Sequence, residues 1–174
     1  NTIIGLRDRA LIGVMVYSFA RVSAVIKMKS SDYYERGRRS WFRLHEKGGR
    51  FHEVPVHHTA EAYIDAYLKM SGLDQTPSAP LFQSIAGRSK LLTGNALSRS
   101  DVLATVKRHA ATAGLSTKVC NHSFRATGIT VFRNNGGTLE NAQIIAAHES
   151  PQTTRLYDRT SDEISLDEIE RILI

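Results

Sequence analysis

Residues 32–56 constrain the fold most, because the hydrophobic pattern changes there from a helical to a β period. Two short runs, Trp41–Leu44 and Phe51–Val54, flank a turn that contains Lys47 and two glycines. Such a layout is typical of a β-hairpin, and Pro55 ends the second strand because it cannot donate to a ladder. The pattern therefore predicts a hairpin with Lys47 at its turn.

On both sides of the hairpin the apolar residues recur at helical spacing. The predicted helices cover residues 5–19, 22–28, 58–72, 98–113, 121–134 and 138–147. Gly72 is expected to stop the third of these helices. Residues 73–95 are rich in Gly, Ser and Pro and predict a connector with a short strand at Leu81 and Phe82. Tyr17, Tyr63 and Tyr67 are expected in the core.

The charge is divided unevenly along the 174 residues. Residues 1–160 hold 22 of the 23 Lys and Arg and 12 of the 17 Asp and Glu, a net charge of +10, whereas residues 161–174 have a net charge of −4. A basic surface favours a polyanionic partner, and nucleic acid ranks above membrane because no basic amphipathic helix with exposed aromatics is evident. The acidic tail carries an apolar stripe at helical spacing.

Length and composition predict one domain in a reducing compartment. The chain has a single cysteine, no apolar run long enough to span a bilayer and no signal-peptide layout at its start. We therefore expect a cytosolic protein. No zinc motif and no acidic cluster suited to a two-metal nuclease is evident, so no metal site and no cofactor is expected.

Two segments carry the candidate chemistry. His122 and Arg125 lie three residues apart at the start of a predicted helix, which places an imidazole and a guanidinium on one face. Taken alone, this pair is more typical of a helix surface without a catalytic or binding role. Further along, His148 precedes Tyr157 by nine residues inside a polar stretch.

With these residues the chain resembles the catalytic domain of the tyrosine recombinases of the phage integrase family, found in bacterial and phage mobile elements. Members carry an arginine after the first helix, a lysine on a β-turn, His-x-x-Arg, a second His or Trp, and a tyrosine about nine residues later. The matching residues, in chain order, are Arg21, Lys47, His122, Arg125, His148 and Tyr157. The resemblance implies a mostly α fold with a small antiparallel β-sheet (α+β).

It also implies a metal-independent cleavage of DNA. Tyr157 would attack the phosphodiester and form a 3′-phosphotyrosyl link, with Arg21 and Arg125 gripping the phosphate oxygens. A phenol has an unperturbed pKa of about 10, so it needs a base, for which His122 is the candidate. Lys47 would protonate the leaving 5′ hydroxyl, and His148 would add a hydrogen bond to the phosphate.

The sequence departs from the family at two places. Many members have an acidic residue three positions after the first arginine, where this chain has Ala24. We expect the absence of this acidic side chain to affect the stability of the Arg21 loop rather than the cleavage reaction. The Leu-Gly pair common before the second histidine is replaced by Ala146 and Ala147, which we interpret as a harmless change in packing.

The family implies double-stranded DNA as partner, a homotetramer on paired sites and a bacterial cytoplasmic, nucleoid-associated location. Residues 1–174 would form the catalytic domain, without the amino-terminal clamping domain, and residues 161–174 a carboxy-terminal tail that packs on its own subunit or is exchanged between subunits. Three alternatives stay open: a type IB topoisomerase, a non-catalytic DNA-binding protein that kept the fold, and an RNA-processing enzyme that would leave Tyr157 without a task.

Overall fold

The computed structural model describes residues 2–46, 51–87, 89–115, 118–148 and 151–156. Within them the fold is mainly helical with two small antiparallel sheets, which confirms the predicted fold class. In chain order the elements are α1 (Ile3–Tyr17), α2 (Val22–Val25), η1 (Ser30–Asp32), β1 (Tyr33–Arg36), β2 (Arg39–His45), β3 (Phe51–Pro55), α3 (His58–Ser71), η3 (Leu73–Gln75), β4 (Gln83–Ile85), β5 (Leu92–Ala96), α4 (Arg99–Thr112), α5 (Asn121–Asn134), α6 (Leu139–Ile145) and α7 (Pro151–Arg155).

The predicted hairpin is confirmed as strands β2 and β3, which pair antiparallel with Phe42 opposite Val54. A third strand, β1, adds to the other edge of β2 and was not predicted. Phe42, Leu44 and Val54 are buried on the inner face of the sheet. The alternation along β2 follows from the period of two, which sends every second side chain into the core.

The main core lies between α1, α3, α4 and the inner face of the sheet. Leu11, Val14 and Met15 of α1 are fully buried there, together with Tyr67 of α3. The prediction that Tyr17 belongs to this core is wrong. Its side chain is 37% exposed and stacks on the His57 ring, with the ring centroids 4.3 Å apart.

The connector of residues 73–95 differs from its prediction. Leu81 and Phe82 are fully buried in the main core but do not form a strand. The strands lie next to them, in β4 and β5, which pair antiparallel with an irregular register. The buried Gln83 side chain accepts a hydrogen bond from the Gly94 amide at 2.8 Å, so a polar side chain supports this pairing.

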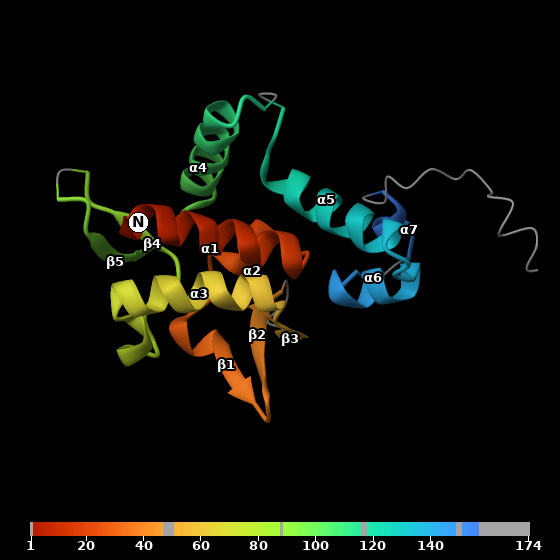
Figure 1. The fold of residues 1–174 in the computed structure, drawn as a ribbon, viewed down its shortest axis with the longest axis horizontal. Helices are drawn as coiled ribbons and strands as arrows, with labels where there is room; N and C mark the ends of the chain where they lie inside the picture. Colours follow the sequence, from red (N-terminus) through yellow and green to blue (C-terminus); the bar gives the residue numbers. More distant parts are fainter. Residues whose placement is uncertain (1, 47–50, 88, 116–117, 149–150, 157–174) are drawn as a thin grey trace, which may run out of the picture.

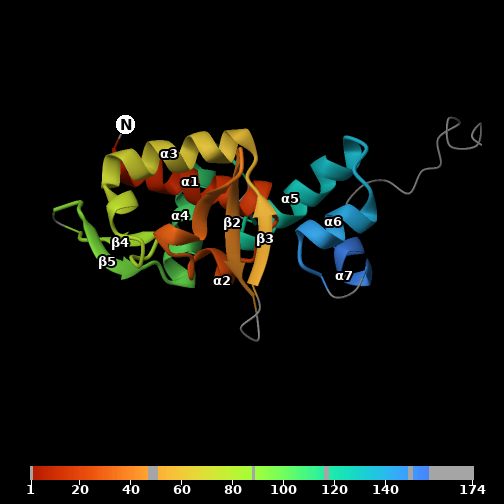
Figure 2. The ribbon, with the colours of Figure 1, turned by 90° about the horizontal axis from the view of Figure 1, so that it is seen from below.

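The described residues form two parts, the body (residues 2–115) and the small helical unit (residues 118–156). In Figures 1 and 2, α6 and α7 lie at one end of the molecule, and α5 connects them to the body. The small helical unit has its own core of Ile129, Ala142 and Ala146, into which Phe19 of the body inserts. At the crossing of α5 and α1, a Cβ on Gly128 would lie 2.4 Å from the Val16 carbonyl oxygen. The two helices can therefore approach this closely only because residue 128 is glycine.

Candidate active site

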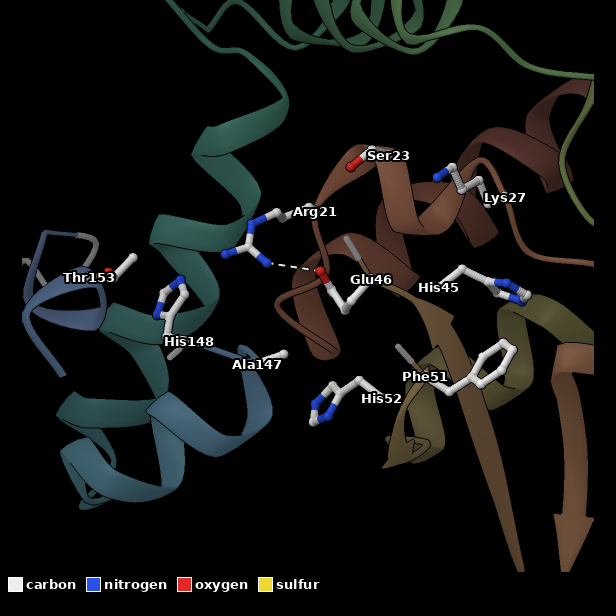
Figure 3. A pocket seen from close by; sticks show the side chains of 10 residues that line it. All are labelled: Arg21, Ser23, Lys27, His45, Glu46, Phe51, His52, Ala147, His148 and Thr153. Carbon is white, nitrogen blue, oxygen red and sulfur yellow. Dashed lines mark hydrogen bonds and ion pairs between the residues drawn. The ribbon is translucent and has the colours of Figure 1, made fainter. Parts of the chain in front are cut away.

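A cavity of about 700 Å³ lies where the body meets the small helical unit. Figure 3 shows the side chains that line it, which come from α2 and the residues on either side of it, the end of β2, the start of β3, the turn after α6, and α7. These residues are Arg21, Ser23, Lys27, His45, Glu46, Phe51, His52, Ala147, His148 and Thr153. Two of the six predicted site residues, Arg21 and His148, therefore face one cavity although they lie far apart in the sequence.

Arg21 is placed by a tight turn after α1. Phe19 adopts a left-handed backbone conformation with φ of 52°, and its side chain is buried in the core of the small helical unit. Arg21 is the N-cap residue of α2, and its side chain is 38% exposed. Its Nη1 atom donates a hydrogen bond to Glu46 Oε2 at 2.9 Å (Figure 3). A single carboxylate contact leaves other N–H donors of Arg21 directed at the cavity.

Arg125 lies on α5, one turn after the start of the helix, and contacts His148 of the cavity lining. Its side chain is 1% exposed and donates hydrogen bonds to the carbonyl oxygens of Phe19 and Ala146, the latter at 2.6 Å. Its Nη2 atom also contacts Nε2 of His148. Arg125 therefore joins the turn before Arg21 to the turn before His148.

His148 follows a second strained turn. Ala147 has φ of 48°, a conformation that favours glycine, so the replacement of the family's glycine by alanine affects the backbone rather than packing. Our interpretation of this change as harmless packing is therefore wrong. The His148 ring is buried, and its Nδ1 atom lies 2.8 Å from Thr154 Oγ1. Burial, followed by the charges of Arg125 and Arg21, lowers the pKa of His148 to about 4.

His122 lies on the first turn of α5, as predicted, and is exposed to solvent. It is not one of the side chains that line the cavity. Lys47 and Tyr157 lie outside the described residues, so their predicted places in the site stay predictions. Of the residues adjacent to them in sequence, Glu46 lines the cavity, and Leu156 is exposed.

Sequence reasoning missed six polar residues of the site, Ser23 and Thr153 and four ionisable ones. His45 and His52 were predicted as strand or turn residues, which they are, yet both line the cavity together with Lys27 and Glu46. His52 Nε2 donates to the Ile145 carbonyl oxygen at 3.0 Å and so connects β3 to α6. The only available signal was the alternation of β2 and β3, which places His45 on the face opposite the buried Leu44.

The described part of the chain contains no group of three or more His, Cys, Asp or Glu side chains placed to hold a metal ion. None of its helices combines the length and the apolar character that crossing a membrane requires. The charged groups at the cavity are instead mostly cationic, with Arg21 and Lys27 facing it and Glu46 as the one carboxylate among its lining residues.

Comparison with known proteins finds similarity to recombinases over most of the chain. The model of the phage integrase family matches residues 1–163. Tyrosine recombinase XerD of Xanthomonas axonopodis pv. citri (strain 306) is 29% identical over 161 residues, which cover 90% of this chain and 52% of that protein. The chain spans about half the length of the relatives it matches.

Solved structures show the same fold. The XerH site-specific recombinase bound to its difH substrate superimposes with a TM-score of 0.73 and 21% identity, covering 99% of this chain and 48% of that chain. The XerA recombinase gives a TM-score of 0.75 and 23% identity, covering 96% of this chain and 57% of that chain. The arrangement of helices and small sheets is therefore shared with these recombinases.

Proposed function

The chain belongs to the phage integrase family, and we propose that it is the catalytic domain of a site-specific DNA recombinase with Tyr157 as nucleophile. The family match and the recombinase relatives support the enzyme class, a tyrosine-type site-specific recombinase. Because the chain spans about half the length of those relatives, the activity, substrate and assembly of the whole protein are part of the proposal.

One observation carries this proposal: residues from distant parts of the chain converge on one cationic cavity. Arg21 and His148 line it, and the buried Arg125 contacts His148. Arg125 also bonds to the carbonyl of Phe19, two residues before Arg21, so the two arginines are held relative to each other. Such a set suits a phosphodiester, whose non-bridging oxygens gain negative charge as it is cleaved.

The proposed reaction is a transesterification that conserves bond energy. The Tyr157 oxygen attacks the phosphorus and transfers its proton to His122, which is exposed at the start of α5 and accessible for proton exchange. The bond from phosphorus to the 5′ oxygen breaks, and Lys47 protonates that oxygen. A 3′-phosphotyrosyl link and a free 5′ hydroxyl result, and a 5′ hydroxyl from a partner strand reverses the reaction.

The arginines stabilise the charge that develops in this reaction. Arg21 is partly exposed at the cavity and is proposed to contact the phosphate directly, since its guanidinium keeps donors free of the Glu46 contact. Arg125 is buried and already bonded to two backbone carbonyls, which fixes its orientation before DNA binds. Fixed donors lower the reorganisation needed in the transition state.

The proposed partner is double-stranded DNA, and the proposed location is the bacterial cytoplasm, at the nucleoid. The net charge of +10 on residues 1–160 supports a polyanionic partner. The XerH structure was determined with its difH substrate bound. We further propose a homotetramer on paired sites, in which the acidic tail of residues 161–174 is exchanged between subunits.

Trapping a covalent adduct tests this proposal. The full-length protein would be incubated in EDTA with a nicked duplex, selected beforehand for tight binding, whose cleaved end diffuses away. Wild-type protein should form a protein–DNA adduct, and Tyr157→Phe should form none while it still binds the duplex, because only the attacking oxygen is lost.

Tyr17→Phe is the matched control, because Tyr17 is a partly exposed tyrosine outside the cavity. It should form adduct at the wild-type rate. Adduct formation by Tyr157→Phe, or cleavage that requires Mg²⁺, would contradict the proposal. Relaxation of supercoiled DNA by the protein alone would favour a type IB topoisomerase instead.

A further inference from the structure

The cavity continues past Arg21, on the side away from His148. Figure 3 shows Lys27 and His45 on one side of Arg21 and His148 on the other. Lys27 lies just after the end of α2, and His45 is the last residue of β2. The volume of about 700 Å³ is in the range of cavities that hold a drug-sized ligand, which is more than one phosphodiester group requires. The proposed reaction gives Lys27 and His45 no role.

Lys27 adds a positive charge to this part of the cavity. Its side chain is exposed and lines the cavity, and it makes no ion pair with any other described residue. Glu46, the one carboxylate among the lining residues, already accepts from Arg21 at 2.9 Å. Cations that gather without a matching carboxylate repel one another, and a bound anion removes this repulsion. The charge of Lys27 therefore favours an anionic ligand beside Arg21.

His45 is fixed at the cavity by a buried carboxylate. Its Nε2 atom lies 2.7 Å from Oδ2 of Asp32, whose side chain is 5% exposed and also accepts from the Lys29 amide at 2.8 Å. An ionised carboxylate only accepts hydrogen bonds, so Nε2 donates to it. Among the described residues, Nδ1 of His45 has no hydrogen-bond partner. In the protonated ring, Nδ1–H can donate to a phosphate oxygen while Asp32 compensates the positive charge.

We propose that Lys27 and His45 form a second phosphate subsite, which binds the phosphate next to the scissile one on the same DNA strand. This inference rests on the proposed function, in which Arg21 contacts the scissile phosphate. The four residues of α2, about 6 Å in length, separate Arg21 from Lys27, which favours two phosphates over one shared between them. Successive phosphates of a strand advance by about 3.4 Å along the duplex axis, so a strand bound at Arg21 brings the next phosphate into the same cavity.

A second subsite determines the direction of the bound strand. A single phosphate contact fixes one point of the strand, whereas two contacts also fix its course through the cavity. The course of the strand matters for the reaction, because attack requires the nucleophile, the phosphorus and the leaving oxygen to be aligned. Lys27 and His45 therefore bind and align the strand, and they neither form nor break a bond.

DNA in which single phosphates are neutral tests this subsite by binding alone. The full-length protein would carry Tyr157→Phe, so that affinity is measured without cleavage. Each duplex, selected beforehand for tight binding, carries one methylphosphonate, which removes the charge of one phosphate. Arg21→Gln, Lys27→Gln and His45→Gln are compared on the whole series. Lys69→Gln is the matched control, because Lys69 is an exposed lysine in the last turn of α3 that does not line the cavity.

The expected result is a pair of neighbouring phosphates, each coupled to its own cation. On unmodified DNA, Lys27→Gln should bind about tenfold more weakly, and the slope of log affinity against log salt should fall by about 1. Lys27→Arg should restore most of the affinity. At one methylphosphonate position the loss caused by Lys27→Gln should vanish, because that contact is already gone. At an adjacent position on the same strand the loss caused by Arg21→Gln should vanish instead.

The two members of the subsite should share one phosphate. The loss caused by His45→Gln should vanish at the same position as that of Lys27→Gln, and Lys69→Gln should bind every duplex as well as the parent protein does. Because His45 pairs with a buried carboxylate, thermal unfolding checks that His45→Gln is folded. If it is not, the exposed Lys27 decides the test. Coupling of a folded His45→Gln to another phosphate, or to none, would overturn the part of His45.

Three outcomes would overturn the second subsite itself: wild-type affinity of Lys27→Gln, coupling of Lys27 and Arg21 to the same phosphate, or coupling of Lys27 to no phosphate or to one that is not adjacent on the same strand. The recombinase proposal is tested separately, with the Tyr157 side chain intact. The phosphate coupled to Arg21 should be the one that becomes joined to Tyr157 in the adduct. Absence of adduct would overturn the recombinase proposal, while the binding result for Lys27 and Arg21 would stand.

Discussion

The body and the small helical unit are stabilised in different ways. The body encloses a continuous apolar core built from α1, α3, α4 and the sheet. The small helical unit buries Ile129, Ala142 and Ala146 around Phe19, a residue that belongs to the body. With so little apolar surface of its own, the unit depends on polar contacts to backbone carbonyls.

Those polar contacts involve site residues. Arg125 bonds to the carbonyls of Phe19 and Ala146, and His52 bonds to the carbonyl of Ile145. In the body, by contrast, Arg21 makes one ion pair at a partly exposed position. The same proposed role, contact with a phosphate, is therefore combined with a structural role in Arg125 and not in Arg21.

The largest expected effect separates these two arginines. Arg125→Ala should destabilise the small helical unit by about 3–5 kcal/mol, because it leaves buried carbonyls without donors and opens a cavity. Arg21→Ala should cost less than about 1 kcal/mol, as expected for a partly exposed ion pair. Both variants should lose adduct formation.

Amide hydrogen exchange distinguishes the two effects. In Arg125→Ala, protection should fall in α5 and α6 and remain in α1 and α3 of the body. In Arg21→Ala, protection should match the wild type throughout. Equal loss of protection in both parts of Arg125→Ala would show that they unfold together, and the comparison would then be wrong.

The second prediction concerns the loss of stability of the small helical unit as the pH falls. The pKa of His148 is about 4 in the folded protein and about 6.5 in an unfolded chain, so the unfolded state binds more protons between these values. Stability from this group is complete above pH 6.5 and is lost as the pH falls toward 4, by at most about 3 kcal/mol. Urea unfolding at pH 7 and pH 4.5 should show this decrease. His148→Gln should flatten the pH dependence, and an unchanged slope would contradict the prediction.

The third prediction tests the contact between the two parts. Gly128→Ala places a methyl group against the Val16 carbonyl and the Phe19 ring, with Cβ distances of 2.4 and 2.7 Å. We expect a loss of about 2 kcal/mol from the free energy of unfolding, as for overpacking elsewhere. Gly5→Ala is the control: its Cβ would meet only the Thr2 hydroxyl, at 3.4 Å, and alanine in a helix should raise stability. An unchanged free energy of unfolding in Gly128→Ala would mean that α5 can move away from α1 without loss of stability.

The fourth prediction reverses that substitution at a strained turn. Ala147 has φ of 48°, so Ala147→Gly should raise the stability of the small helical unit by about 1 kcal/mol. Ala113→Gly, at the C-cap of α4 with φ of −85°, should lower stability or leave it unchanged. Thermal unfolding of both variants measures the difference. A stabilised Ala113→Gly or a destabilised Ala147→Gly would contradict the strain at residue 147.

Local patterns explain how much of the fold the sequence could predict. The apolar spacing of α1, the hairpin and the left-handed Gly72 that ends α3 depend on neighbouring residues, and these were predicted correctly. Strands β4 and β5 were not predicted, because their pairing is supported by the buried side chain of Gln83, a polar residue with no strand pattern around it. The β2–β3 hairpin joins residues that are as far apart in the sequence, but its strands carry an apolar alternation that Gln83–Ile85 and Leu92–Ala96 lack.

For the site, too, the residues could be identified from local sequence spacing, whereas their long-range contacts could not. Family spacing identified Arg21, Arg125 and His148, and the structure brings these three together. The burial of Arg125 could not be predicted, since its carbonyl partners lie 106 and 21 residues away in the chain. The described residues do not include Lys47 or Tyr157, so those assignments stay predictions.

The last and smallest effect concerns the acidic partner of Arg21. The family's acidic position is Ala24 here, and Ala24 is buried in the main core, where a carboxylate would lack water. Glu46 supplies a carboxylate from the end of β2 instead, 2.9 Å from Arg21. If the cavity binds phosphate as proposed, a lone carboxylate there weakens DNA binding, so we expect that the contribution of Glu46 lies in orienting Arg21.

Glu46→Gln should therefore change stability by less than about 1 kcal/mol but separate binding from cleavage. DNA affinity should rise slightly, because a negative charge facing phosphate is removed, while the single-turnover rate should fall about threefold as Arg21 loses its charged partner. Glu53→Gln is the matched control, since Glu53 pairs with Arg36 and Arg43 on the exposed face of the sheet and does not line the cavity. It should leave the cleavage rate unchanged. If Glu46→Gln instead lowers affinity and rate together, Glu46 supports the hairpin end that precedes Lys47 rather than the direction of Arg21, and the body would then share the dependence on polar contacts that distinguishes the small helical unit.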